Sequence, residues 1–158
     1  MYSVNVPVPH DVARLASGLA SNCYLADVRT RHTLVAKRLG ELPSSEEIRR
    51  ALADTPPFAA RVSKIEAFHD PPRGAAPVVY LTVESPELYA LHDRLCERYE
   101  PVAGFEGEGY DPHVTIARGG DADKLLGSAV DPIEWTVDRL DVWDAEYREV
   151  VETVSLPV

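Results

Sequence analysis

Two segments of the chain each place a histidine beside groups that can bind a phosphate. Residues 32–37 read HTLVAK, and residues 113–118 read HVTIAR. An imidazole titrates near neutrality, so one of two opposed histidines can accept a proton while the other donates one. Residues i and i+2 of a strand point to the same face, so Thr115 projects beside His113 and can donate to a phosphoryl oxygen. His32 and His113 therefore predict acid–base catalysis at a phosphodiester.

A basic residue ends each segment. Lys37 and Arg118 occupy matching positions when the two histidines are aligned, and the two residues before each of them match as well. Both side chains can neutralise phosphate oxygens and donate hydrogen bonds to them. We therefore expect Lys37 and Arg118 to bind the phosphate, although regular alternation does not put Arg118 on the face of His113.

The first segment departs from the second at one position. Counting from His32, the position of Thr115 holds Leu34, and Thr33 falls on the opposite face of a regular strand. The match of the residues that follow favours this register, whereas the alternative register keeps Thr33 as the threonine and puts Arg31 at the histidine position. In the favoured register, a β-bulge could return the Thr33 hydroxyl to the site. Without a bulge, this half binds phosphate with one donor fewer.

The pattern along the chain predicts the elements that position these residues. Residues 1–68 and 77–143 each predict the order strand-helix-strand-helix-strand, and a turn-rich connection separates them. A final strand follows the second copy, so we expect one domain, 1–158, of two pseudo-symmetric lobes at 1–68 and 77–158. The expected strands are 2–7, 28–37, 58–68, 78–83, 113–117, 133–143 and 150–156, and the expected helices are 10–21, one from 44, one from 86, and 121–128.

The segment PHVTIAR at 112–118, together with the duplicated order, resembles the two-histidine phosphoesterase superfamily, which includes the 2′–5′ RNA ligases and RNA 2′,3′-cyclic phosphodiesterases. The resemblance extends over nearly the whole chain. It implies an α+β bilobal fold with duplicated βαβαβ halves around a central cleft. It also implies a reaction without metal or cofactor, with His32 as the general acid and His113 as the general base.

This resemblance further implies the substrate and product. A 2′,3′-cyclic phosphate on an RNA end or a nucleotide would open to a 2′-phosphate, and 2′–5′ RNA ligation is the possible reverse reaction. Two titrating imidazoles predict a bell-shaped pH profile. Two alternatives stay open: cleavage of a cyclic phosphodiester on a non-RNA small molecule, and a member that binds nucleotides or RNA ends without turnover. Leu34 at the threonine position favours the binding alternative.

A glycine-rich segment, GFEGEG at 104–109, precedes the second histidine. It follows an expected helix rather than a strand and carries two glutamates, which argues against a phosphate-binding loop. We expect a rim over the cleft, with Phe105 or Tyr110 available to stack on a base.

The composition restricts the compartment and the partners. There are 26 acidic and 16 basic residues, 13 of the latter arginine, and the net charge is −10. This lysine-poor, acidic composition resembles that of halophile proteins, in which high salt screens the repulsion of an anionic substrate. Two cysteines, Cys23 and Cys96, make no disulfide framework or zinc site. With neither a secretory leader nor an 18-residue apolar run, the chain is expected to be cytoplasmic and without a membrane partner.

Overall fold

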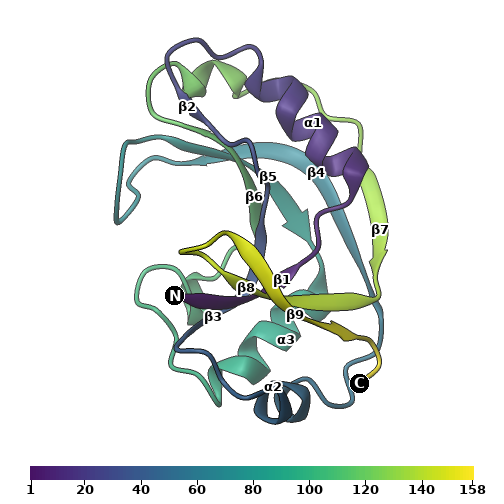
Figure 1. The fold of residues 1–158 in the computed structure, drawn as a ribbon. Coiled ribbons are helices and arrows are strands. Elements are labelled where there is room, and N and C mark those ends of the chain that lie inside the picture. Colours follow the sequence, from purple (N-terminus) through teal and green to yellow (C-terminus); the bar gives the residue numbers. More distant parts are fainter.

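Two antiparallel sheets form the centre of the computed structural model, which describes all of residues 1–158 (Figure 1). The order of the elements largely follows the expected alternation of strands and helices. In chain order they are β1 (Tyr2–Val6), α1 (His10–Ala20), β2 (Asp27–Val28), β3 (Leu34–Gly40), α2 (Ser45–Ala51), β4 (Phe58–Phe68), β5 (Val78–Glu84), α3 (Pro86–Cys96), the 3₁₀ helix η1 (Gly107–Gly109), β6 (His113–Arg118), the 3₁₀ helix η2 (Ala122–Leu125), β7 (Ile133–Val137), β8 (Arg139–Asp144) and β9 (Glu149–Ser155).

Each sheet takes strands from both halves of the chain. One sheet has the order β3-β1-β8-β9, and the other has the order β2-β6-β5-β4-β7. The sheets therefore do not follow the expected division into residues 1–68 and 77–158. The expected strand 133–143 is in fact two strands, because the chain leaves one sheet after β7 and enters the other at β8.

The two halves of the chain are duplicated, but they exchange strands, so that each sheet contains strands from both halves. The order β3-β1-β8 in one sheet matches the order β6-β5-β4 in the other. Within these six strands, each half of the chain contributes two neighbouring strands to one sheet and a single strand to the other. The helices are exchanged too. Helix α1 follows β1 but contacts β6, and α3 follows β5 but contacts β3. In Figure 1, α1 lies beside the sheet that contains β6, and α3 beside the sheet that contains β3. The predicted bilobal α+β fold is confirmed, with lobes that share their strands and helices.

Local signals fix the starts of the two later helices. The Ser44 side chain accepts a hydrogen bond from the Glu47 backbone, and the Glu47 carboxylate accepts one from the Ser44 backbone, which completes a capping box for α2. Ser85 caps α3 by accepting from Leu88 N, and its hydroxyl donates to Ala59 O on β4 at 2.7 Å. This second contact ties the start of α3 to the start of β4, an interior strand of its sheet.

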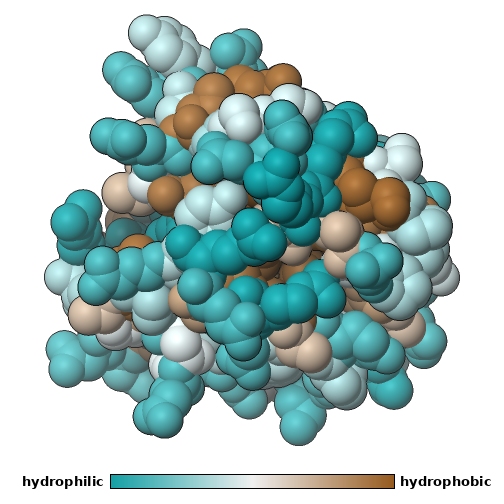
Figure 2. All heavy atoms as spheres, turned by 90° about the horizontal axis from the view of Figure 1, so that it is seen from below, coloured by the Kyte–Doolittle hydropathy of each residue, from teal (hydrophilic) through white to brown (hydrophobic).

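The core is one continuous hydrophobic cluster that both sheets and the helices share. Val4, Leu34, Leu81, Leu88 and Ile116 are all fully buried within it. The surface seen in Figure 2 is mostly hydrophilic, with hydrophobic side chains in small separate groups. No helix has the length and apolar character needed to cross a membrane.

Replacement of Ser85 by alanine tests the helix cap. Ser85→Ala removes the acceptor for Leu88 N and the donor to Ala59 O, so we expect a loss of about 1–2 kcal/mol of unfolding free energy. The measurement is urea denaturation, with the exposed Ser128→Ala as control. Equal stability of the two variants would contradict the role of Ser85.

Candidate active site

The second histidine segment forms β6, and a β-bulge within this strand shapes the site. Thr115 pairs with Tyr80 and Ala117 pairs with Val79, so Ile116 is an extra residue on β6. The bulge reverses the alternation of side chains beyond it. As a result, Arg118 lines the same cavity as His113 and Thr115, which regular alternation did not predict.

Strand β3 carries a bulge of the same kind. Val35 pairs with Asn5 and Lys37 pairs with Val4, so Ala36 is the extra residue. Arg38 therefore faces the cavity, and Lys37 is fully buried in the protein interior. The expectation that Lys37 binds the phosphate is wrong, because the bulge directs the Lys37 side chain into the protein interior and the Arg38 side chain to the cavity.

The two bulges also identify equivalent positions in the two strands. Thr115 is one residue before the bulge in β6, and His113 is three residues before it. Counting in the same way from the bulge in β3, Val35 takes the place of Thr115, and Thr33, the residue just before β3, takes the place of His113. Both Thr33 and Val35 line the cavity, so a hydroxyl and an isopropyl group stand where an imidazole and a hydroxyl stand in the other strand.

His32 does not line the cavity. Its Nε2 lies 3.2 Å from the Ser17 hydroxyl of α1, and burial lowers the pKa of its imidazole. Between β2 and β3 the chain bends at residues 30 and 31, and Arg29, Arg31 and Thr33 of this segment line the cavity, whereas His32 does not. The expectation that His32 and His113 oppose each other across the cleft is therefore wrong. Arg31, the histidine position of the alternative register, does line the cavity.

His113 is held in its neutral form. Its Nδ1 lies 2.6 Å from the carbonyl oxygen of Asp111, and because a carbonyl can only accept, Nδ1 carries the proton and Nε2 is left as an acceptor. The ring packs edge-on against Phe68, with centroids 5.1 Å apart, and is tilted against Tyr80 at 5.0 Å. Burial, aided by the nearby Arg38 charge, lowers the pKa of His113. The imidazole is therefore uncharged at neutral pH.

The cavity has a volume of about 560 Å³ and is rich in arginine. Five arginines line it against two carboxylates, Asp70 and Asp111, so it is locally cationic in a protein with a net charge of −10. The five are Arg29, Arg31, Arg38, Arg118 and Arg148. Such a cavity attracts anions. No group of three or more His, Cys, Asp or Glu side chains is arranged to hold a metal ion.

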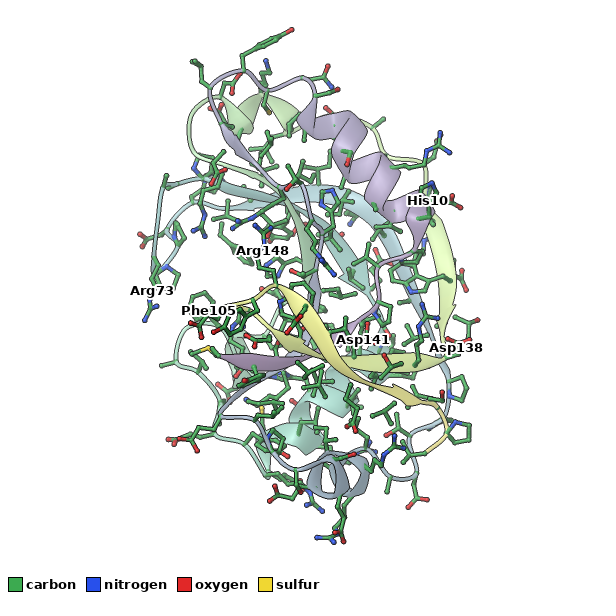
Figure 3. All side chains as sticks on the ribbon, in the orientation of Figure 1. His10, Arg73, Phe105, Asp138, Asp141 and Arg148 are labelled. Carbon is green, nitrogen blue, oxygen red and sulfur yellow. The ribbon has the colours of Figure 1, made fainter.

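Two of these arginines stack on aromatic rings. The Arg38 guanidinium lies 4.9 Å from the centre of the Phe105 ring, and the Arg31 guanidinium lies 4.4 Å from that of Trp143. Figure 3 shows Phe105 and Arg148 on the same side of the molecule, on the loop before β6 and on the turn between β8 and β9. These contacts hold the guanidinium groups in fixed orientations.

The two aromatic residues expected to stack on a base have different environments. Phe105 is half-buried and lines the cavity, so its ring is accessible there. Tyr110 also borders the cavity but is only 5% exposed; its ring stacks on His92 at 3.7 Å, and its hydroxyl donates to Val35 O. Tyr110 is therefore a structural residue, and the expectation that it stacks on a base is wrong.

No pattern in the sequence pointed to the residues that attach the rim loop (residues 104–109) to the bulge in β3. The Glu106 carboxylate accepts from Lys37 Nζ at 2.7 Å, from Arg38 N at 2.8 Å and from Val102 N at 3.0 Å. Burial alone would raise the pKa of Glu106, but these hydrogen bonds together hold it below its ordinary value. A glutamate in a glycine-rich loop carries no local signal of this role.

His92 makes a similar attachment from α3. Its Nδ1–H donates to Ala36 O at 2.7 Å, and its Nε2 accepts from Gly107 N at 3.0 Å. With Glu106 and Tyr110, it provides partners for the polar backbone groups around the bulge. The rim loop thus stabilises the conformation that turns Arg38 toward the cavity.

The family model of the 2′-5′ RNA ligase superfamily matches residues 44–148. The chain belongs to this superfamily. The match includes His113 and begins after β3, the strand with the altered positions. A search of curated proteins gave no match.

Solved structures agree on the fold over nearly the whole chain. The protein TT0787 of Thermus thermophilus is 20% identical with a TM-score of 0.62, covering 98% of this chain and 97% of that one. A protein described as a phosphoesterase is 16% identical, with a TM-score of 0.61 and coverages of 98% and 97%. E. coli LigT in its apo form is 14% identical, with a TM-score of 0.60 and coverages of 98% and 95%. The chain thus has a two-histidine phosphoesterase-like fold, and its family supports a phosphoesterase-type function.

The buried ion pair gives a stability prediction. Glu106→Gln leaves Lys37 buried without a counter-charge, so we expect a loss of about 3–5 kcal/mol in urea denaturation. Because the pKa of Glu106 is lowered on folding, its contribution is present above its ordinary pKa and is lost as the pH falls through the folded value.

A matched control and a double variant complete this test. Glu108→Gln, on the same loop but exposed, is expected to change stability by less than about 0.5 kcal/mol. Adding Lys37→Met to Glu106→Gln removes the unpaired charge and should recover much of the loss. Similar stabilities for Glu106→Gln and Glu108→Gln would contradict the importance of the pair.

Proposed function

We propose that the protein is a phosphodiesterase that hydrolyses a cyclic phosphate with His113 as its single general base. The observation that carries this proposal is the Nδ1–H···O contact from His113 to Asp111, which leaves Nε2 as a free acceptor in an arginine-lined cavity. A neutral imidazole with its acceptor nitrogen beside bound phosphate is the arrangement that removes a proton from water.

The cavity supplies donors for the reacting phosphate. In the proposed reaction, the Thr33 and Thr115 hydroxyls donate to phosphoryl oxygens, and Arg38 and Arg118 neutralise their charge. His113 takes a proton from water as the water oxygen bonds to phosphorus and the bond from phosphorus to the leaving oxygen breaks. Solvent protonates the leaving oxygen, because no second imidazole lines the cavity. His113 then returns its proton to solvent.

The proposed substrate is a 2′,3′-cyclic phosphate on an RNA end or a nucleotide, and the product is a 2′-phosphate. The cavity volume of about 560 Å³ lies within the range of small-ligand sites, and Phe105 provides a ring on which a base can stack. The free thiols of Cys23 and Cys96 fit a reducing compartment, so we place the reaction in the cytoplasm.

A second candidate function is binding of RNA ends or nucleotides without turnover. Thr33 and Val35 favour it, since they replace a potential acid and a phosphate donor at positions equivalent to His113 and Thr115. Leu34, which the sequence analysis placed at the threonine position as the reason to favour binding, is fully buried in the core and does not line the cavity. Turnover of a cyclic phosphate separates the two functions.

The pH dependence tests the single-base mechanism. We expect the rate to rise with pH through one ionisation below 6.5 and then to stay level, because the pKa of His113 is lowered and its neutral form is active. The assay is hydrolysis of an RNA oligonucleotide ending in a 2′,3′-cyclic phosphate, in molar salt. This replaces the bell-shaped profile expected for two histidines, and a bell-shaped result would overturn the single-base assignment.

His113→Asn is the companion variant in that assay. We expect a hundredfold or greater loss of rate, while the exposed His69→Asn retains wild-type activity. Substantial activity in folded His113→Asn would remove His113 from the mechanism. An absence of wild-type cleavage, with nucleoside 2′-phosphate still bound, would establish the binding function instead.

Thr33→His tests the assignment of equivalent positions. A histidine at this position would face the cavity opposite His113 and could protonate the leaving oxygen, so we expect a rate increase of about a hundredfold and a new descending limb at high pH. Leu34→Thr serves as the contrast, because a hydroxyl in the core lowers stability without raising the rate. A rate increase in Leu34→Thr and none in Thr33→His would instead favour the register that aligns His32 with His113.

A further inference from the structure

The number of arginines in the cavity exceeds what the proposed reaction needs. A cyclic phosphodiester carries one negative charge, and Arg38 and Arg118, at equivalent positions after the two bulges, suffice to neutralise it. Arg29, Arg31 and Arg148 also line the cavity and have no role in that step. This surplus indicates a ligand with more negative charge than one cyclic phosphate.

The lack of ion pairs at these arginines supports the inference of a more highly charged ligand. The protein has 26 acidic residues, yet Arg29, Arg31, Arg118 and Arg148 form no ion pair with any of them. The Nε of Arg118 is buried and has no hydrogen-bond partner within the protein. Guanidinium groups left free in so acidic a chain remain available for an external anion.

Arg31 and Arg148 are also brought together by specific contacts. Arg31 stacks on Trp143 and donates through Nη1 to the backbone oxygen of Arg148 at 3.1 Å. Arg148 has a positive φ of 55° at the turn between β8 and β9, where the chain reverses beside the cavity. The stack and the hydrogen bond hold Arg31 in place before an anion arrives, which lowers the cost of ordering it on binding.

We propose that Arg31 and Arg148, with Trp143 behind Arg31, form a second phosphate subsite in the same cavity. The inference rests on the proposed function, because it takes the reacting phosphate to lie at His113. The ligand is then a nucleotide with a second phosphate besides the cyclic one. This phosphate is either a terminal 5′-phosphate or the internucleotide phosphate of an RNA chain, and both present anionic phosphoryl oxygens on the 5′ side of the nucleoside.

Binding of non-reacting product analogues tests the subsite without requiring catalysis. The probes are adenosine 2′-phosphate, adenosine 2′,5′-bisphosphate and a diadenosine 2′-phosphate with either a natural or a neutral methylphosphonate linkage. Affinities are measured by calorimetry at fixed salt. We expect the second phosphate to tighten binding about tenfold to a hundredfold, and the methylphosphonate linkage to abolish that gain.

Arg148→Gln is the test variant, and Arg73→Gln is its matched control. Arg73 is exposed at the tip of the β4–β5 connection and does not line the cavity, as Figure 3 shows for its position, so the two variants lose the same charge. We expect Arg148→Gln to remove most of the gain from the second phosphate and Arg73→Gln to retain it. Arg31→Gln provides a second variant with the same expected loss.

The outcomes separate this inference from the proposed reaction. A gain with the bisphosphate alone identifies a small nucleotide, and a gain with the natural dinucleotide alone identifies an RNA end; either supports the subsite. No gain in the wild-type protein, or a gain that survives both arginine variants, overturns it. Because these ligands do not react, failure of the cyclic phosphate to be hydrolysed would contradict the proposed reaction and leave the binding result intact.

Discussion

The extra residue in each of β3 and β6 is the local constraint on which the site depends. Without the bulges at Ala36 and Ile116, side-chain alternation would turn Arg38 and Arg118 away from the cavity. A bulge also interrupts regular backbone pairing, and the freed polar groups need partners. Around Ala36, the protein meets this need with buried side chains from the rim loop and α3, so the loop, the helix and the site form one connected unit.

Charge is distributed so that the overall and the local fields have opposite signs. The chain carries −10, while arginine dominates the cavity, and the carboxylate nearest the bulge, Glu106, is neutralised by a buried lysine. At short range, unpaired guanidinium groups outweigh distant carboxylates, whose fields water and salt screen. An acidic protein can therefore present an anion-binding cavity, provided that few acidic side chains line it.

The site combines one intact motif with one altered motif on equivalent strands. In β6, an imidazole and a hydroxyl face the cavity; on the β3 side, Thr33 and Val35 stand at the equivalent positions. The superfamily match begins at residue 44 and so lies entirely after the altered strand. The change removes a titrating group from one side while preserving the fold and the cationic lining. In the proposed reaction, both strands therefore contribute groups that bind the phosphate, and His113 alone transfers a proton.

The sequence by itself determined the features that depend on short-range patterns. Most of the element order, the helix starts near residues 44 and 86 and the His113–Thr115 pair follow from spacing and capping within a few residues. Only the tertiary structure decided which way His32 and Lys37 face, how the strand 133–143 divides between two sheets, and which helix covers which sheet. The physical reason is that one bulge reverses alternation, and its position depends on pairing with a distant strand and on partners such as Glu106, 69 residues from Lys37.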